Sequence, residues 1–349
     1  MRFPHAMSLF RKGMVVFLGL LVLFLLWSAD AFFGRSDFSG PPFLLTVSHG
    51  TPFRVVVGAL ARRGLITKPE TVILWGDVLG IARAIREGDY EISGEDRPFR
   101  IFWNLVAGQR YYRRLTVPEG FTVAQVAARM ARLGIGTMDR DLSLMSDPAF
   151  IGRLRVPSTS LEGYLFPNTY YFSRGTSPRE VLTMMVSRFW HVVTPGWRDQ
   201  SSQQGLSLAQ AVILASIVQK EAGTAKDMPL VAGVFLNRLH NRMKLQSDPT
   251  VLYVMPGHHR LSASDLRIDS PYNTYLHDGL PPTPISNPGA EALHAVLFAE
   301  KVPYLYFVSA GPGTPSIFSR TLADHDRAIL RIIKNKRRAA REAAIRATK

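Results

Sequence analysis

Residues 207–223 read SLAQAVILASIVQKEAG, a segment with the spacing of a buried helix. Ser207 and Gln210 have the form of a capping box, which predicts that the helix starts at Ser207. Gly223 is a typical residue for a helix end, so we expect the helix to stop there. One face of this helix carries Leu214, Ile217, Val218 and Glu221, which are spaced i, i+3, i+4 and i+7. Glu221 therefore continues an apolar face, and we expect it to be partly buried.

Glu221 is a candidate general acid because two effects act on its carboxyl group. Partial burial disfavours the charged form, and the partial negative charge at a helix C-terminus disfavours it again. Both effects raise the pKa, toward about 6, which suits proton transfer near neutral pH. Lys220 would oppose this if its side chain lay close. On the helix pattern alone, the alternative interpretation is a surface glutamate in a frayed last turn.

Loops rich in aromatic, amide and acidic side chains flank the predicted helix. Tyrosine rings can cover sugar rings, and Asn, Gln and Asp can bind hydroxyl and acetamido groups. Such loops form a binding cleft more often than a core. The segments are EGYLFPNTY (162–170), NRL (237–239), MKLQSDPT (243–250), SPYNTY (270–275) and GLPPTPI (279–285). Their accumulation around Glu221 predicts a saccharide-binding cleft.

Several long motifs in one order make the chain resemble the YceG-like family of endolytic murein transglycosylases. The motifs are EGYLFPNTYYF (162–172), LASIVQKEAG (214–223), VAGVFLNRL (231–239), MKLQSDPTVLY (243–253), SPYNTY (270–275), GLPPTPISNPG (279–289) and YLYFVSAGPGTPSIFSRTLADH (304–325). The resemblance covers roughly residues 160–325. An apolar N-terminus and a LysM-like module before the catalytic region also fit the family layout.

The resemblance implies that the enzyme is a lyase that cuts the β-1,4 bond between N-acetylmuramic acid and N-acetylglucosamine and leaves a 1,6-anhydro end. One glutamate suffices for this reaction, whereas glycoside hydrolases use two carboxylates. The family glutamate matches Glu221. Family members often have glutamate where this chain has Gln219. A glutamine cannot exchange a proton at neutral pH, so Glu221 is the candidate in that motif. No cofactor is implied.

The resemblance also implies the cleft residues and the partners. The residues expected to bind the strand are Gln246, Asp248, Tyr272, Asn273, Thr274 and Tyr275. Glu162 is a further cleft candidate, and a structural role at a helix N-cap or turn is equally open. Asn168 stands where the family more often has Asp, which we expect the fold to tolerate. The expected partners are nascent peptidoglycan glycan strands and peptidoglycan synthases.

The N-terminus predicts export of the rest of the chain. Basic residues precede an apolar run from Met14 to Trp27, which is the positive-inside pattern. Extended over Gly13–Ala29, the run reaches the lower limit for a spanning helix, roughly 17 residues. The alternative is a signal peptide cleaved at the small-x-small site Ala29-Asp30-Ala31. Because Phe32 and Phe33 extend the apolar character, we expect an uncleaved single-pass anchor in the cell (inner) membrane, with the catalytic domain on the periplasmic or extracellular side.

We expect a mixed α+β fold in four parts. They are a cytoplasmic N-terminus with a transmembrane anchor (1–35), an N-terminal module with a LysM-like subdomain (36–140), a catalytic domain (141–330) and a basic tail (331–349). Val47–Leu65 and Val117–Ile135 form a weak repeat, each predicting a strand end, a Gly turn and an amphipathic helix closed by Gly. Such units can bind glycan or serve only as a spacer, and the sequence leaves both interpretations open. Trp190–Leu206 is polar and predicts an exposed connection.

Composition limits the other functional classes. The net charge of +15 implies an acidic partner, and the basic segment Arg327–Lys349 is either a solvated helix end or a contact with membrane or wall. The absence of cysteine excludes disulfides and thiolate metal sites. Neighbouring His258 and His259 lack the helical spacing of a zinc enzyme, and no nucleic-acid-binding motif is present. The alternative function is a non-catalytic glycan-binding scaffold of the wall-synthesis machinery.

Overall fold

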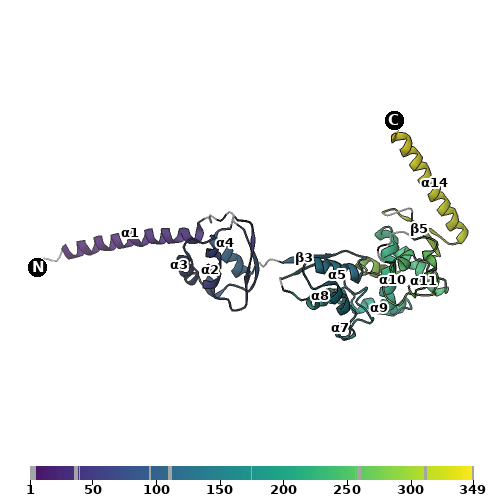
Figure 1. The fold of residues 1–349 in the computed structure, drawn as a ribbon, viewed down its shortest axis with the longest axis horizontal. Coiled ribbons are helices and arrows are strands. Elements are labelled where there is room, and N and C mark those ends of the chain that lie inside the picture. Colours follow the sequence, from purple (N-terminus) through teal and green to yellow (C-terminus); the bar gives the residue numbers. More distant parts are fainter. Residues whose placement is uncertain are drawn as a thin grey trace. The chain divides into compact units, whose positions relative to one another are not determined.

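The computed structural model describes residues 5–34, 38, 40–93, 96–108, 112–173, 175–255, 257, 261–309 and 313–347. The chain forms two compact units, Met1–Arg113 with Tyr171–Arg174, and Arg114–Tyr170 with Gly175–Lys349. Helices predominate, and the described residues contain three two-stranded sheets (Figure 1). The predicted mixed α+β class is therefore confirmed.

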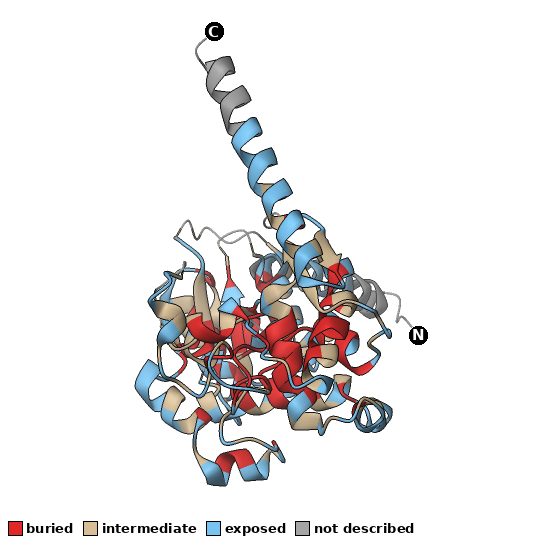
Figure 2. Ribbon diagram, turned by 90° about the vertical axis from the view of Figure 1, so that its right-hand side faces the viewer, coloured by how far each residue is buried: buried red, intermediate tan, exposed pale blue. Residues whose placement is uncertain are grey.

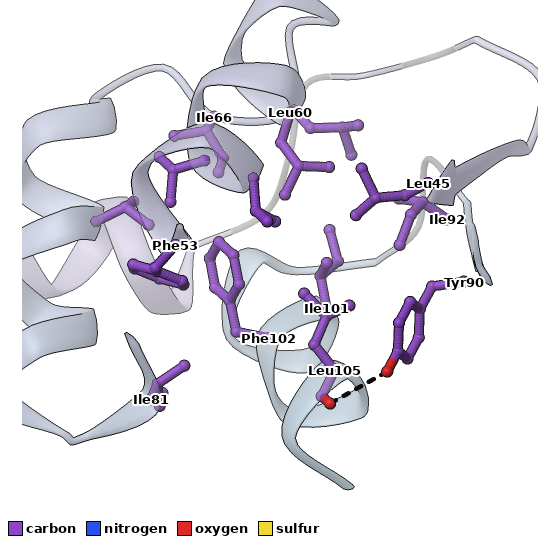
Figure 3. Close-up of a cluster of buried hydrophobic side chains, with 14 of the residues drawn as sticks. Leu45, Phe53, Leu60, Ile66, Ile81, Tyr90, Ile92, Ile101, Phe102 and Leu105 are labelled. Carbon is purple, nitrogen blue, oxygen red and sulfur yellow. Dashed lines mark hydrogen bonds between the residues drawn. The ribbon is translucent and has the colours of Figure 1, made fainter. Parts of the chain in front are cut away.

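The first unit is built on one antiparallel strand pair. β1 (Phe43–Val47) pairs with β2 (Gly88–Ile92), so that Leu45 lies opposite Tyr90. The helices around this pair are α2 (Phe53–Arg62), α3 (Pro69–Val78), the short 3₁₀ helix η1 (Ile81–Arg83) and α4 (Pro98–Ala107). Their apolar side chains form one buried cluster, in which the Tyr90 hydroxyl donates a hydrogen bond to the Leu105 carbonyl at 3.3 Å (Figure 3).

The first helix, α1 (His5–Phe33), has two different parts. At its end, the buried Phe32 stacks on Phe102, with 5.8 Å between the ring centroids. Before that, the described apolar side chains between Met14 and Trp27 are exposed. Among the described residues, no helix has the length and apolar character that a membrane span requires.

The second unit contains the remaining helices and two strand pairs. Strand β3 (Arg113–Val117) pairs with β4 (Asn168–Phe172), and β5 (Tyr306–Ser309) forms an antiparallel hairpin with β6 (Ser316–Ser319). The longer helices are α5 (Val123–Arg132), α6 (Met138–Met145), α7 (Pro148–Arg153), α8 (Pro178–Val192), α9 (Pro195–Gln203), α10 (Leu208–Glu221), α11 (Met228–His240), α13 (Ala290–Leu297) and α14 (Leu322–Ala347). Shorter helices are η2 (Ala225–Asp227), α12 (Asp248–Leu252) and η3 (Asp265–Arg267).

Helix α10 is the centre of the second unit. Its capping box is formed as predicted, with the Ser207 hydroxyl accepting from Gln210 N and the Gln210 side chain accepting from Ser207 N. Residues 211–218 are all buried, because α10 packs against α9, α11, α12 and α13. The buried residues of this packing lie at the middle of Figure 2. A helix covered on every side holds the residue at its end in a fixed position.

Two local predictions differ from the structure. Helix α10 ends at Glu221, and the chain leaves it through Ala222 in an extended conformation (φ −68°, ψ 124°), so Gly223 does not form a left-handed cap. The predicted connection 190–206 contains helix α9. Pro195 at its first turn and the contact of Trp197 with Phe298 stabilise this polar helix, which has no apolar periodicity in the sequence.

The two copies of the repeat have the predicted strand, glycine turn and helix, with φ of 73° at Gly50 and 74° at Gly120. They lie in different compact units, however, and the boundary between these units falls at 113/114. The second copy belongs with α10 because Gly120 N donates to the Asn287 carbonyl and Asn287 N donates to the Phe121 carbonyl, each at 2.8 Å.

The predicted basic tail (331–349) is helical where the structure describes it. It continues α14, which starts at Leu322 and contacts β5 and β6. Beyond these contacts the described residues of α14 are mostly exposed (Figure 2). The side chains of Arg341 and Arg346 lie outside the described residues.

Candidate active site

A cavity of about 380 Å³ lies at the C-terminal end of α10. Its lining residues are Glu221, Phe235, Arg238, Leu245, Gln246, Asp248, Tyr275, Tyr306, Phe307, Val308, Ser309, Leu322 and His325. Four residues of the predicted site are among them, namely Glu221, Gln246, Asp248 and Tyr275. The others, Glu162, Tyr272, Asn273 and Thr274, do not line this cavity. The volume is in the range of small-ligand pockets.

Glu221 is half-buried at the floor of this cavity, with protein atoms packed around its carboxyl group. Burial raises its pKa to about 7, and the nearby Asp248 carboxylate adds to the rise. The Ser247 hydroxyl donates to Glu221 Oε1 at 2.6 Å and acts in the opposite direction, as does the positive charge of Arg238. Glu221 therefore exchanges a proton near neutral pH, which is the property that a general acid and base requires.

The loop before α12 holds Ser247 in place. Ser247 is fully buried, its N–H donates to Thr274 Oγ1 at 3.0 Å, and its carbonyl accepts from Thr250 Oγ1 at 2.6 Å. Asn273 is also fully buried, and its amide donates to the Leu266 and Ile268 carbonyls. Thr274 and Asn273 thus support the loops that carry the site, whereas the sequence predicted that they would face the strand.

Gln246 has a left-handed backbone, with φ of 51°, between the buried Leu245 and Ser247. Its N–H donates to the Thr274 carbonyl at 3.1 Å. A non-glycine residue in this conformation costs roughly 1 kcal/mol. Because the conformation directs the neighbours on both sides inward, Gln246 remains exposed at the cavity.

Two of the predicted tyrosines have different partners. The Tyr275 hydroxyl donates to Asp248 Oδ1 at 2.6 Å, so both residues lie together on the cavity wall. The Tyr272 hydroxyl is hydrogen-bonded to Thr283 Oγ1 at 2.6 Å, and its ring lies 5.0 Å from that of Tyr253. Tyr272 therefore joins two loops and does not reach the cavity.

Arg238 lines the cavity from α11, although no individual role was predicted for it from the sequence. Its Nε donates to the Leu305 carbonyl at 2.8 Å, and Nη1 donates to the Leu245 carbonyl at 2.8 Å. The guanidinium group is therefore fixed between two segments that both contribute to the cavity lining. Its positive charge favours the ionised form of Glu221. The NRL motif contained this residue, but only the fold reveals its contacts.

An apolar wall is the second feature that sequence reasoning missed. Strand β5 contributes Tyr306, Phe307 and Val308, and the first turns of α14 contribute Leu322 and His325. The same cavity is also lined by the polar residues Glu221 and Asp248. All residues of this wall lie within the motif at 304–325. The motif therefore identified the segment, but it did not indicate that the segment lines the cavity.

Glu162 lies apart from the cavity and is fully buried. Val123 N at the start of α5 donates to both carboxyl oxygens at 3.1 Å, and the Tyr253 hydroxyl donates to Oε2 at 3.1 Å. Asn287 Nδ2 donates to Oε1 at 3.3 Å. Burial raises the pKa of Glu162 to about 8, while the hydrogen bonds from Val123, Tyr253 and Gly163 lower it. Of the two roles left open by the sequence, the contacts favour the structural one at a helix N-terminus.

Replacing Glu162 with alanine is expected to lower the free energy of unfolding by about 3–5 kcal/mol, because Val123 N and the Tyr253 hydroxyl lose their acceptor and Asn287 Nδ2 loses one of its two acceptors. Urea unfolding of the full chain measures this, with Glu291→Ala on the exposed face of α13 as the control. Normal stability together with weaker strand binding would instead indicate a cleft role.

Gln219 occupies a structural position in the last turn of α10. Gly289 N donates to Gln219 Oε1 at 2.9 Å, which joins α10 to the start of α13. Glu221, by contrast, lies at the cavity. Of positions 219 and 221 in the motif, position 221 lies at the cavity and carries the acidic side chain.

Histidines are common metal ligands in proteins. Within the described ranges, no group of three His, Cys, Asp or Glu side chains has a metal-binding arrangement. His258 and His259 lie outside the described residues.

The fold and the cavity define a mixed α+β protein whose site is organised around one carboxyl group at a helix end. The chain belongs to the YceG-like family, whose model matches residues 45–331. The resemblance found in the sequence motifs is thereby confirmed.

Individual relatives support the same assignment. The chain is 30% identical over 309 residues to the endolytic murein transglycosylase of Bacillus subtilis (strain 168), covering 84% of this chain and 85% of the relative. It is 31% identical over 248 residues to the endolytic murein transglycosylase of Streptococcus pneumoniae serotype 2 (strain D39 / NCTC 7466), covering 64% of this chain but only 45% of that protein. A crystal structure of a yceG-like protein from Listeria monocytogenes matches with a TM-score of 0.57 and 31% identity, over 83% of this chain and 100% of that chain.

Proposed function

We propose that this protein is an endolytic lytic transglycosylase of peptidoglycan, with Glu221 as its single general acid and base. The observation that carries the proposal is a carboxyl group with a pKa of about 7 at the floor of a ligand-sized cavity. The relatives named endolytic murein transglycosylase support the choice of substrate. The proposed target is the β-1,4 bond between N-acetylmuramic acid and N-acetylglucosamine in nascent strands.

In the first step, protonated Glu221 donates its proton to the oxygen of the glycosidic bond, and the bond between that oxygen and C1 of the muramic residue breaks. N-acetylglucosamine leaves with a free 4-hydroxyl group. Glu221 is now a carboxylate, which the Ser247 hydrogen bond and the charge of Arg238 stabilise. Asp248 in the same cavity supplies negative charge beside the positive charge that develops at C1.

In the second step, the Glu221 carboxylate takes the proton of the muramic 6-hydroxyl while O6 forms a bond to C1. This closes the 1,6-anhydro ring and restores protonated Glu221, so no water molecule is consumed. A group that gives and then takes a proton works best when its pKa is near the ambient pH. The alternative function, a scaffold that only binds glycan, has no need for such a group.

Digestion of purified glycan strands with the full chain tests the proposal, with mass spectrometry of the new ends. We expect 1,6-anhydro ends within strands as well as at their termini. Reducing ends would indicate a hydrolase, and intact strands would favour the scaffold.

We further propose that α1 anchors the chain in the cell membrane, that the second unit acts on the outer side, and that the first unit is LysM-like. The support for the anchor is the row of exposed apolar side chains between Met14 and Trp27, which water solvates poorly. Peptidoglycan synthases are the proposed partners, on family grounds alone. We expect the full chain to sediment with membranes and to need detergent for release. Recovery in the soluble fraction after lysis without detergent would contradict the anchor.

A further inference from the structure

His325 is a residue of the cavity that the reaction scheme above does not use. It lies one turn into α14 and lines the cavity together with Leu322 from the same helix. Its ring stacks on that of Tyr306, with 5.5 Å between the centroids and 27° between the planes. Nδ1 is buried and has no hydrogen-bond partner in the described part of the chain.

The burial of His325 favours the neutral imidazole. Burial lowers its pKa, Arg238 lowers it further, and Asp326 opposes them. Arg238 also lies on the Tyr306 ring, with its Cζ atom 5.3 Å from the centroid, so aromatic and cationic groups surround the imidazole. A second proton on this ring would therefore meet a fixed positive charge.

The tautomer follows from the position of Nδ1. A proton on Nδ1 would be a buried donor without an acceptor, which is costly. The single proton of the neutral ring is therefore assigned to Nε2. Because Nδ1 is buried and His325 lines the cavity, Nε2 is the ring nitrogen that remains for a ligand there. An N–H donor facing a cavity selects a ligand that carries an oxygen acceptor.

We propose that His325 binds the substrate, with its Nε2–H donating a hydrogen bond to a hydroxyl or acetamido oxygen of the saccharide held beside Glu221. This rests on the proposed function, because it assigns the ligand of the same cavity. His325 belongs to the same cavity lining as Glu221 and Asp248, and its ring stacks on Tyr306 of the apolar wall. Nε2 is the one ring nitrogen that the described lining residues offer to the ligand.

If His325 had only a structural role, its hydrogen-bond donor would not be required. Stacking on Tyr306 needs only an aromatic ring, which phenylalanine supplies. Replacing an unpaired buried nitrogen with carbon costs the free protein little or no stability. His325→Phe therefore separates the two roles, because it keeps the stack and removes only the donor.

The experiment measures binding of a soluble tetrasaccharide of alternating N-acetylglucosamine and N-acetylmuramic acid by calorimetry. All variants carry Glu221→Gln, so that binding is measured without cleavage. We expect His325→Phe to weaken binding about tenfold, the loss of one hydrogen bond to a neutral group. His325→Gln, whose amide N–H can reach the position of Nε2, is expected to restore most of the affinity. His294→Phe on the exposed face of α13 is the control and should bind like the parent.

Thermal unfolding of each variant is followed in parallel, and we expect His325→Phe to melt within a few degrees of the parent. Equal affinity of the parent, His325→Phe and His325→Gln would overturn the inference, as would a parent that does not bind the tetrasaccharide. If His325→Phe does not fold, His325→Leu and His325→Gln give the same comparison. Absence of anhydro ends in the strand digestion would overturn the proposed reaction alone, because the binding comparison does not depend on cleavage.

Discussion

Replacing Glu221 with glutamine is expected to lower strand cleavage about 1,000-fold, the contribution typical of a positioned general acid. Glutamine has nearly the same shape and can still accept the hydrogen bond from Ser247. It cannot release or take up a proton, so both steps of the proposed reaction fail. The rate of formation of anhydro ends on purified strands is the measurement.

The same substitution is expected to leave the fold intact. Above pH 7 it should even stabilise the chain, because burial disfavours an ionised carboxylate at this position. The rise is on the order of 3 kcal/mol, from the difference between a pKa of about 7 and the ordinary 4.5. Glu300→Gln, on an exposed loop, serves as the matched control and should change neither quantity. Full cleavage by a folded Glu221→Gln chain would move the catalytic role to another residue.

The position of Glu221 could be predicted because one helix determines it. The capping box fixes the start of α10, and the apolar stripe fixes which face of its last turn is covered. Residues of the site that depend on several segments were harder to assign. Thr274 and Gln246 belong to two loops of similar composition, and only their packing decides which is buried and which faces the cavity.

The apolar wall and Arg238 show a second limit. Strand β5 and the start of α14 reach the cavity only through long-range contacts, such as the bond from Arg238 to the Leu305 carbonyl. Sequence periodicity describes neighbours within one element and carries no information on such contacts. The repeat illustrates the same point for the fold. Both copies predict the correct local structure, yet the hydrogen bonds of Gly120 and Asn287 place the second copy in a different unit.

The rate of strand cleavage is expected to fall as the pH rises through about 7, which is the pKa of Glu221. The first step needs the protonated form, whose fraction decreases about tenfold per pH unit above the pKa. The fall should therefore approach roughly 100-fold by pH 9. Initial rates between pH 5 and pH 9, at saturating and at limiting strand concentration, measure it.

The titration of Glu221 should also appear in the stability of the chain, as a free energy of unfolding that decreases when the pH rises. The folded-state pKa of about 7 lies above the ordinary 4.5, so the unfolded chain loses this proton first as the pH rises. The stabilisation is therefore fully present below about 4.5 and is lost between there and about 7. Glu221→Gln should remove this part of the pH dependence, which urea unfolding at several pH values can detect. Glu162 adds a second loss that extends to about 8, so the comparison needs the parent chain at each pH.

Ser247→Ala is expected to move the fall in rate to higher pH, by roughly one unit, because it removes a hydrogen bond that favours the ionised carboxylate. Asp248→Asn should move it to lower pH, because the Asp248 carboxylate raises the pKa of Glu221. Opposite shifts from two neighbouring residues are difficult to obtain from a general disturbance of the loop. Ser202→Ala on the exposed side of α9 is the control for handling and folding. A profile that stays flat from pH 6 to pH 9, or shifts of the same sign in both variants, would show that a group other than Glu221 delivers the proton.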